Sequence, residues 1–139
     1  MKCADVMSTN PETCLPSESV LAALHLMRRV NVGAVPVVAS RETMRAVGMV
    51  TDRDIALELG ERDARPSDLR CGDVMSTPSV AVQASADLDE ATVEMRERQL
   101  RRILVEDHGR LVGIISQADL AHHRPQDAAK VVEDISKAA

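Results

Sequence analysis

The chain repeats part of its own sequence, and this repeat limits the possible folds more than any other feature. The pentapeptide DVMST occupies residues 5–9 and again residues 73–77. The same offset, with a small later change of spacing, aligns two further pairs of segments: VPV at 35–37 with ILV at 103–105, and GMVT at 48–51 with GIIS at 113–116. Two copies of one pattern are expected to fold as two copies of one small structural unit, neither of which buries its apolar faces alone.

The repeat also predicts how the chain is divided. We expect four segments: a first copy at residues 1–59, a polar linker at 60–68, a second copy at 69–124, and a C-terminal helix at 125–139. The last segment begins with Pro125, a residue that suits the first position of a helix. Its apolar residues fall at helical spacing: Ala128, Val131, Val132 and Ile135. This pattern predicts that the helix docks on the body of the protein or on a partner chain.

Apolar periodicity predicts the order β-α-β-β-α in both copies. A short strand is expected first, at 12–16 and 79–83, and then an amphipathic helix capped by Ser19 or by Asp87, the latter with Glu90 in a capping box. Two strands rich in β-branched residues and a short helix complete each copy: 34–39, 46–50 and 53–59 in the first, and 103–105, 111–115 and 118–122 in the second. The Asp-His-Gly sequence between the last two strands of the second copy predicts a hairpin.

These elements predict an α/β (α+β) protein in which two β-α-β-β-α repeats pack about a pseudo-twofold axis. Apolar helix faces near Leu21, Leu24, Leu57 and Leu88 are not expected to be covered within one chain, so we predict a homodimer. The chain has no Phe, Trp or Tyr. Its core must therefore consist of Val, Ile, Leu, Met and Ala, and a planar ligand would have to be held by aliphatic side chains and backbone amides.

Charge, hydropathy and missing motifs argue against several functions. The formal net charge is −5 and the basic residues are dispersed, which disfavours binding to nucleic acid or to an anionic membrane. No apolar run approaches the roughly 18 residues needed to span a bilayer, and the first residues lack the apolar stretch of a secretory signal. We therefore expect a cytoplasmic protein. Without a Gly-x-Ser-x-Gly motif, a phosphate-binding loop or a nucleophile–base set, we expect no enzyme activity.

The cysteines and histidines show no spacing that is typical of a metal site. Cys3, Cys14 and Cys71 are odd in number and form no CxxC pair, which favours free thiols; a redox or metal role is the alternative. His122 and His123 are adjacent, so on a helix they point in different directions and not at one ion. We expect no metal site.

The strongest candidate site lies where the third strand of each copy runs into a helix. Both copies show glycine, two apolar residues, a hydroxyl residue and, three residues later, an aspartate: Thr51 with Asp54, and Ser116 with Asp119. Free backbone N–H groups at such a junction favour a phosphate, and the aspartate can accept hydrogen bonds from the two hydroxyls of a ribose. The alternative is an ordinary N-cap followed by a solvated acid.

Taken together, the duplicated DVM opening, the VPV strand and the GMVTDRDI segment resemble the CBS domain family, named after cystathionine β-synthase. The resemblance extends to about Arg124 and is greatest to small bacterial proteins that consist only of a tandem CBS pair. It implies a Bateman module with two clefts, a regulatory role in signal transduction, and binding of AMP, ADP or ATP, with S-adenosylmethionine or NAD as further possibilities. It also implies pairing of two chains into a flat disk.

The resemblance implies that each cleft is shared between the copies. One cleft would join Thr51, Arg53 and Asp54 with Val80, Ala81, Arg102 and Ile103. The other would join Ser116 and Asp119 with Thr13, Cys14, Ala34 and Val35. Only the first would hold an arginine suited to a phosphate, since Ala34 is the repeat partner of Arg102. The chain departs from the family pattern at Leu104, which stands where the first copy has Pro36.

Two functions therefore remain open. The leading hypothesis is a non-catalytic sensor that binds an adenosyl ligand and reports to an unidentified partner protein. The alternative is a structural or interaction protein with empty clefts, for example one that serves stress survival. Occupancy of the clefts distinguishes the two.

Overall fold

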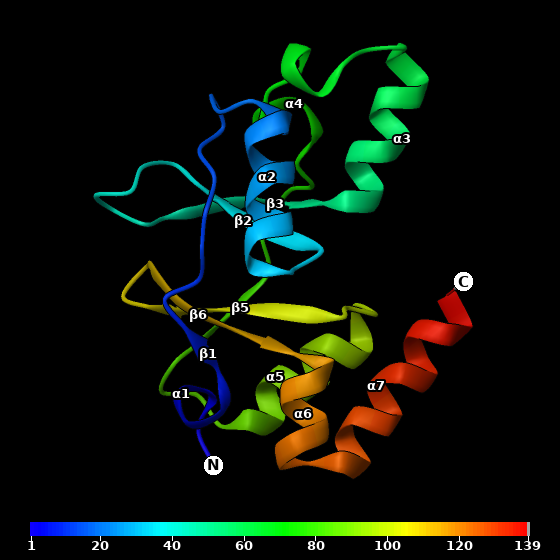
Figure 1. The fold of residues 1–139 in the computed structure, drawn as a ribbon. Coiled ribbons are helices and arrows are strands. Elements are labelled where there is room, and N and C mark those ends of the chain that lie inside the picture. Colours follow the sequence, from blue (N-terminus) through cyan, green and yellow to red (C-terminus); the bar gives the residue numbers. More distant parts are fainter. Residues whose placement is uncertain (139) are drawn as a thin grey trace. The chain divides into compact units, whose positions relative to one another are not determined.

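The computed structural model describes residues 1–138, and the chain forms two compact units. The first-copy unit is the continuous segment Glu12–Ser79, whereas the second-copy unit combines Met1–Pro11 with the chain from Val80 onward. The opening segment of each sequence copy thus packs in the unit that holds the rest of the other copy. Figure 1 shows this exchange for the N-terminal segment, drawn in blue beside the yellow and orange strands of the second copy.

A four-stranded sheet in the order β1-β6-β5-β4 forms the second-copy unit. Its strands are β1 (Ser8–Thr9), β4 (Ala81–Gln83), β5 (Arg102–Asp107) and β6 (Arg110–Ser116). Its helices are α1 (Cys3–Val6), α5 (Leu88–Glu97), α6 (Gln117–His123) and α7 (Pro125–Ala138). Strand β4 runs parallel to β5, and β6 is antiparallel to both β1 and β5. His108 and Gly109 connect β5 to β6 with φ angles of 52° and 78°, as a tight hairpin turn requires, so the predicted hairpin is confirmed.

The first-copy unit contains the antiparallel pair β2 (Ala34–Val38) and β3 (Ala46–Thr51). Its helical segments are α2 (Val20–Val30), α3 (Asp52–Arg62), a short 3₁₀ helix (Pro66–Asp68) and α4 (Cys71–Val74). The strand expected at 12–16 is reduced to a single parallel bridge between Cys14 and Val37. Pro11 and Pro16 lack a backbone N–H, which limits pairing to the middle of this segment. The mixed α/β class is confirmed, with a weaker first strand in the first copy.

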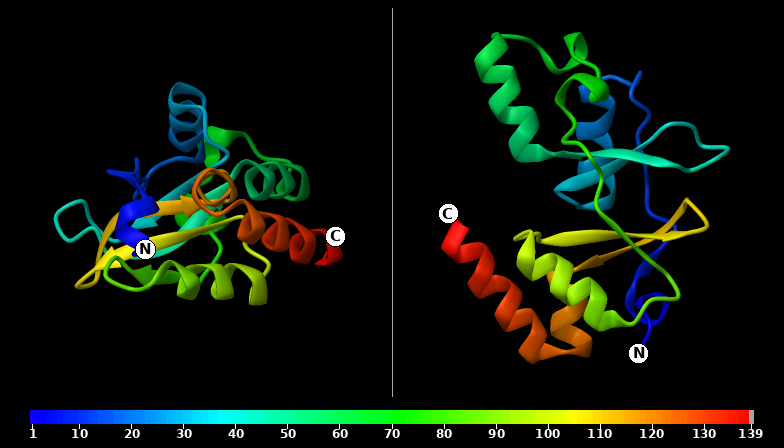
Figure 2. Two further views of the ribbon diagram at one scale, coloured as in Figure 1. Left: turned by 90° about the horizontal axis from the view of Figure 1, so that it is seen from below. Right: turned by 180° about the vertical axis from the view of Figure 1, so that it is seen from behind.

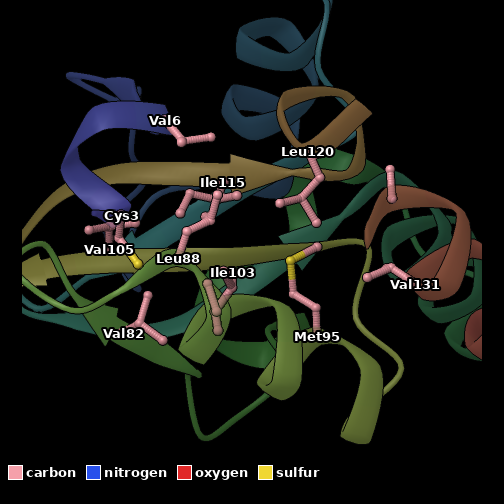
Figure 3. Packing of buried hydrophobic residues seen from close by; sticks show 12 residues of the cluster. Cys3, Val6, Val82, Leu88, Met95, Ile103, Val105, Ile115, Leu120 and Val131 are labelled. Atoms are coloured by element: carbon pink, nitrogen blue, oxygen red, sulfur yellow. The ribbon is translucent and has the colours of Figure 1, made fainter. Parts of the chain in front are cut away.

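Aliphatic side chains fill both cores. In the second-copy unit, Leu88 and Met95 of α5 pack with Ile103 and Val105 of β5 and with Ile115 of β6 (Figure 3). The equivalent cluster of the first-copy unit draws on α2, β2 and β3: Val20, Ala23, Leu26, Met27, Val35, Val37 and Val50. Both cores therefore follow from the 3.6-residue and two-residue periodicities of the sequence.

Polar side chains cap the helices near the predicted positions. The Ser19 hydroxyl accepts a hydrogen bond from the backbone N–H of Ala22 at 3.1 Å, which confirms this cap. The Asp87 carboxylate accepts one from the N–H of Asp89 at 2.9 Å. The predicted box between Asp87 and Glu90 is replaced by this shorter local bond, because an aspartate side chain reaches the second N–H of the helix readily.

Helix α7 docks within the second-copy unit. Of the two predicted arrangements, docking on the body or on a partner chain, the structure shows the first. Ala128 and Val131 are buried, and Ile135 packs against the same cluster, whereas Val132 is 47% exposed. Arg96 of α5 forms an ion pair with Asp134 of α7 at 2.9 Å. Figure 2 shows α7 lying alongside α5 and α6 in both views. Ala139, the last residue of the predicted helix, lies outside the described residues.

The exposed apolar residues differ in part from the expectation. Leu57 is 59% exposed and Leu21 is 36% exposed. Leu88, predicted to belong to the uncovered faces, is instead completely buried, because it belongs to the core cluster that also contains Cys3 and Val82. Among residues 1–138, no helix has the length and apolar character needed to cross a membrane.

Two glycines explain why a DVMST segment and a glycine in the third strand occur together in both copies. A side chain at Gly113 of β6 would place its Cβ 2.5 Å from Sδ of Met7 and 2.9 Å from the carbonyl oxygen of Ser8. At Gly48 of β3, the Cβ would lie 2.8 Å from Sδ of Met75 and equally close to a backbone carbonyl oxygen. Each DVMST segment thus lies directly on the glycine of the strand it pairs with, and only glycine allows that approach.

Alanine at either glycine is expected to lower the free energy of unfolding by about 1–3 kcal/mol, the usual cost of an overpacked core. Gly60 provides the control, because a Cβ there would meet no atom within 4 Å. Gly60→Ala should raise stability by up to about 1 kcal/mol through helix propensity alone. Urea denaturation of the three variants tests this, and similar changes at all three positions would refute the close-packing explanation.

Candidate functional site

Each unit contains one strand-to-helix junction of the predicted kind, and a hydroxyl caps the helix in both. Thr51 ends β3, and its Oγ1 accepts a hydrogen bond from the N–H of Asp54 at 3.0 Å. Ser116 ends β6, and its Oγ accepts one from the N–H of Asp119 at 3.2 Å. The serine and threonine therefore act as N-caps, which accounts for part of the repeated motif.

The two junctions differ in what the aspartate carboxylate does. Oδ2 of Asp119 accepts hydrogen bonds from the N–H of Ser116 at 2.8 Å and from its hydroxyl at 3.0 Å, which closes a capping box. Within residues 1–138, no such return bond links the carboxylate of Asp54 to Thr51. The Asp119 carboxylate is thus committed to its own helix, whereas Thr51 leaves the acceptor capacity of Asp54 for other partners.

Backbone contacts bring the start of β2 to the Thr51 junction. Ala34 lies directly opposite Thr51 in the β2–β3 register, and the N–H of Asp52 donates to the carbonyl of Gly33 at 3.0 Å. The Asp52 carboxylate accepts from the N–H of Arg53 at 2.8 Å. The sequence pattern gives no sign that Gly33 and Asp52 belong to the junction, because only the strand register brings them together.

The equivalent part of the second-copy unit brings together the other predicted residues. Arg102 lies opposite Ser116 in the β5–β6 register, and the N–H of Leu104 donates to the carbonyl of Val80 at 3.2 Å. Ala81 pairs with Leu104 in the parallel β4–β5 ladder. Leu104 stands where the first copy has Pro36. Since proline has no backbone N–H, only the second copy can supply the N–H that the Val80 carbonyl accepts here.

Burial limits what several candidates can offer a ligand. Ile103 and Val35 are each 1% exposed and belong to the cores of their units. Thr13 and Cys14 are also buried, and the Thr13 carbonyl accepts a hydrogen bond from Nη2 of Arg41 at 3.0 Å. Ile103 and Val35 therefore present backbone atoms more readily than side chains. Arg53 is exposed, and Asp54 and Arg102 are half-buried.

Each expected cleft draws residues from both units. Thr51, Arg53 and Asp54 belong to the first-copy unit, together with Thr13, Cys14, Ala34 and Val35. Val80, Ala81, Arg102, Ile103, Ser116 and Asp119 belong to the second-copy unit. Each half of a predicted cleft therefore lies within a single unit. That the two halves join to form one cleft stays a prediction.

A pocket that the sequence did not reveal opens in the first-copy unit. It has a volume of about 320 Å³ and is lined by residues 12–14, Glu18, α2 residues that include His25 and Arg29, and Arg41. Arg41 and Glu18, both in its lining, form an ion pair at 2.7 Å. Three separate chain segments form the pocket, so no local motif marks it. Among the described residues, no group of three or more His, Cys, Asp or Glu side chains is arranged to hold a metal ion.

Comparisons of the sequence and of the structure with known proteins point to the same family. The CBS domain pattern matches residues 3–61 and 71–125. The CBS domain-containing protein YhcV of Bacillus subtilis is 38% identical over 117 residues, which cover 84% of this chain and 81% of that protein. Hypoxic response protein 1 of Mycobacterium tuberculosis is 32% identical over 124 residues, which cover 89% and 85% of the two chains.

Two solved structures extend the comparison. A crystal structure of the hypoxic response protein, which contains two coordinated zinc ions, aligns with a TM-score of 0.80 at 31% identity, covering 90% of this chain and 100% of the other. The protein CBSX2 of Arabidopsis thaliana, crystallised in complex with AMP, aligns with a TM-score of 0.75 at 30% identity, covering 90% and 96%. Both alignments therefore extend over nearly the whole of the two solved chains.

Because only Asp119 completes a capping box, replacing the aspartate by alanine should affect stability differently at the two junctions. Asp119→Ala removes the carboxylate half of a capping box and should lower the free energy of unfolding by about 1 kcal/mol. Asp54→Ala removes no bond of the Thr51 cap and should change stability by less than about 0.5 kcal/mol. Chemical denaturation of both variants checks this, and a larger loss for Asp54→Ala would contradict the assignment of the caps.

Proposed function

This chain belongs to the CBS domain family, and from that membership we propose that it is a non-catalytic regulatory module that binds an adenosyl ligand. AMP, ADP or ATP is the preferred ligand class, with S-adenosylmethionine or NAD as further members of it. The module would act in the cytoplasm and report its ligand to a partner protein. The complex of the relative CBSX2 with AMP supports this choice of ligand.

The observation that carries the proposal is the difference between the two junctions. Asp119 is held in a capping box by Ser116, whereas Asp54 makes no return bond to Thr51 within the described residues. A carboxylate that the helix cap does not occupy is suited to accept hydrogen bonds from the two ribose hydroxyls. We therefore assign the first ligand to the site that contains Thr51 and Asp54.

Each residue of this site has a distinct role in the proposal. Asp54 accepts the ribose hydroxyls, while the Thr51 hydroxyl donates to the phosphate. The first three N–H groups of α3 already have partners, so the hydroxyl, and not the helix N-terminus, supplies this contact. Arg102 neutralises the phosphate charge, and Arg53 lies at the same helix start. Val80, Ala81 and the backbone at Ile103 hold the adenine by dispersion contacts and hydrogen bonds, because the chain has no aromatic ring to stack on it.

The second site, with Ser116, Asp119, Thr13, Cys14, Ala34 and Val35, is expected to bind more weakly or to remain empty. Its carboxylate is already engaged, and its repeat equivalent of Arg102 is an alanine. If both sites were empty, the chain would be a structural or interaction protein, the second candidate function. Burial of Cys14 and Val35 favours that alternative for the second site.

Regulation would arise from differential affinity. A ligand that contacts both units stabilises the arrangement in which both sets of contacts are satisfied, and it shifts the population toward that arrangement by no more than its difference in affinity. Helix α7 is docked in the second-copy unit through Val131 and the Arg96–Asp134 pair. The state of the module would therefore be presented to a partner through the exposed side of this helix.

Calorimetry with AMP tests the ligand proposal. Asp54→Ala should weaken binding roughly tenfold to a hundredfold, since loss of a partner to a charged group costs about 1.5–3 kcal/mol. Asp119→Ala is the matched control and should retain nearly full affinity. Arg102→Ala should reduce the preference for AMP over adenosine. Equal affinity of wild type and Asp54→Ala, or no heat with any adenosyl compound, would favour the empty-cleft function.

The homodimer is a separate proposal, supported by exposed Leu57 on α3 and Leu21 on α2. Light scattering at micromolar concentration should give twice the chain mass of 15.1 kDa. Leu57→Arg should shift the protein toward monomer, because it places a charge in the apolar contact. Val93→Arg, at a residue 50% exposed on α5, is the control. A wild-type mass of a single chain would refute the dimer.

A further inference from the structure

The segment that runs beside β2 in the first-copy unit carries an unused backbone donor. The N–H of Cys14 donates to the carbonyl of Pro36 at 3.0 Å, and the Cys14 carbonyl accepts from Val38 at 2.9 Å. Backbone groups of successive residues point to opposite sides of an extended segment, so those of Thr13 point away from β2. The Thr13 carbonyl accepts from Nη2 of Arg41 at 3.0 Å. In the described part of the chain, the Thr13 N–H has no hydrogen-bond partner.

An ion pair covers the next part of this edge. Nη2 of Arg41 also contacts Oε1 of Glu18 at 2.7 Å, and the same oxygen accepts from the N–H of Leu15 at 2.7 Å. The Thr13 carbonyl and the Leu15 N–H, which an added strand would need, are therefore already bonded. An extended peptide is disfavoured at this edge, and the Thr13 N–H is left for a small ligand.

The pocket of the first-copy unit, with its volume of about 320 Å³, includes Thr13 in its lining. Three exposed side chains of the lining, those of Glu12, His25 and Arg29, make no hydrogen bond or ion pair with any described residue. Leu26, which is 8% exposed, adds apolar surface. The pocket thus combines a free carboxylate, a free guanidinium and a backbone donor with an apolar patch, and its volume suits a small molecule.

We propose that this pocket binds a free α-amino acid in its zwitterionic form. The ligand carboxylate accepts hydrogen bonds from the Thr13 N–H and the Arg29 guanidinium, and its ammonium group donates to the Glu12 carboxylate. The aliphatic part of the ligand packs on Leu26. All lining residues belong to the first-copy unit, so this site goes beyond the adenosyl ligand proposed above. It shares only Thr13 and Cys14 with the second predicted cleft.

The charges of the lining favour a zwitterion over an anion or a cation. With histidine neutral, two arginines balance two glutamates: Arg29 and Arg41 against Glu12 and Glu18. A phosphate or dicarboxylate would face both glutamates, and a simple amine would face both arginines, so each would be partly repelled. An α-amino acid carries no net charge from its backbone groups and presents one charge of each sign a short distance apart. This matches the pocket.

NMR of the full-length, ¹⁵N-labelled protein tests the proposal without any nucleotide present, so it is independent of the adenosyl ligand. Each standard amino acid is added in turn at millimolar concentration. At least one should shift the amide signals of Thr13 and of α2 around Arg29 in a saturable way. Its analogues that lack the amino group or the carboxylate should bind roughly tenfold more weakly, because each loses a charge-assisted hydrogen bond. Inorganic phosphate should not reproduce the shifts.

Matched variants identify the site. Arg29→Gln and Glu12→Gln remove exposed charges that bond to no described residue, so both should fold and give native-like spectra, yet bind the amino acid roughly tenfold more weakly. Arg28→Gln is the control, because Arg28 is exposed on the same helix but lies outside the lining, and it should bind normally. The absence of saturable shifts with every amino acid would overturn the proposal. Equal binding of the analogue without an amino group, or an equal loss in Arg28→Gln, would also overturn it.

Discussion

The structure depends on the packing of each DVMST segment against a glycine-containing strand of the other sequence copy. Met7 and Ser8 lie on Gly113, and Met75 lies on Gly48, at distances that leave no space for a side chain. The short helices α1 and α4, which overlap the first residues of these segments, add backbone bonds, such as Cys3 N–H to the carbonyl of Ala86. Each unit therefore contains residues from both sequence copies in its core.

Local features of the fold were predictable from sequence because local chemistry determines them. Ser19 caps α2, and the His108–Gly109 turn closes a hairpin; both depend on residues within a few positions. The exchange of opening segments was not predictable, because both copies carry the same pentapeptide and both third strands carry the same glycine. A repeat alignment cannot tell whether the pentapeptide at 5–9 packs on Gly48 or on Gly113. Burial of Leu88 was missed because helical periodicity locates an apolar face without showing what covers it.

Divergence between the copies tells more about the candidate site than their similarity does. The sequence predicted two equivalent hydroxyl–aspartate junctions, and both hydroxyls do cap their helices. Only the hydrogen bonds separate the two aspartates: Ser116 binds the Asp119 carboxylate twice, whereas the described residues show no such bond between Thr51 and Asp54. Whether the aspartate bonds back to the hydroxyl residue depends on side-chain and backbone orientation at the end of the strand. The patterns Thr-x-x-Asp and Ser-x-x-Asp alone do not predict it.

The same comparison separates packing from chemistry among the cysteines. Cys3 and Cys71 occupy equivalent buried positions and make equivalent contacts with a backbone carbonyl, so a small buried side chain there serves both cores. Val82 shows that a purely aliphatic residue fills the position opposite, and a free cysteine itself packs as a small apolar side chain. Packing alone therefore gives no reason for a sulfur at Cys14. Cys14 differs from its repeat equivalent Val82 in one further respect, because it also lies in the wall of the pocket of the first-copy unit.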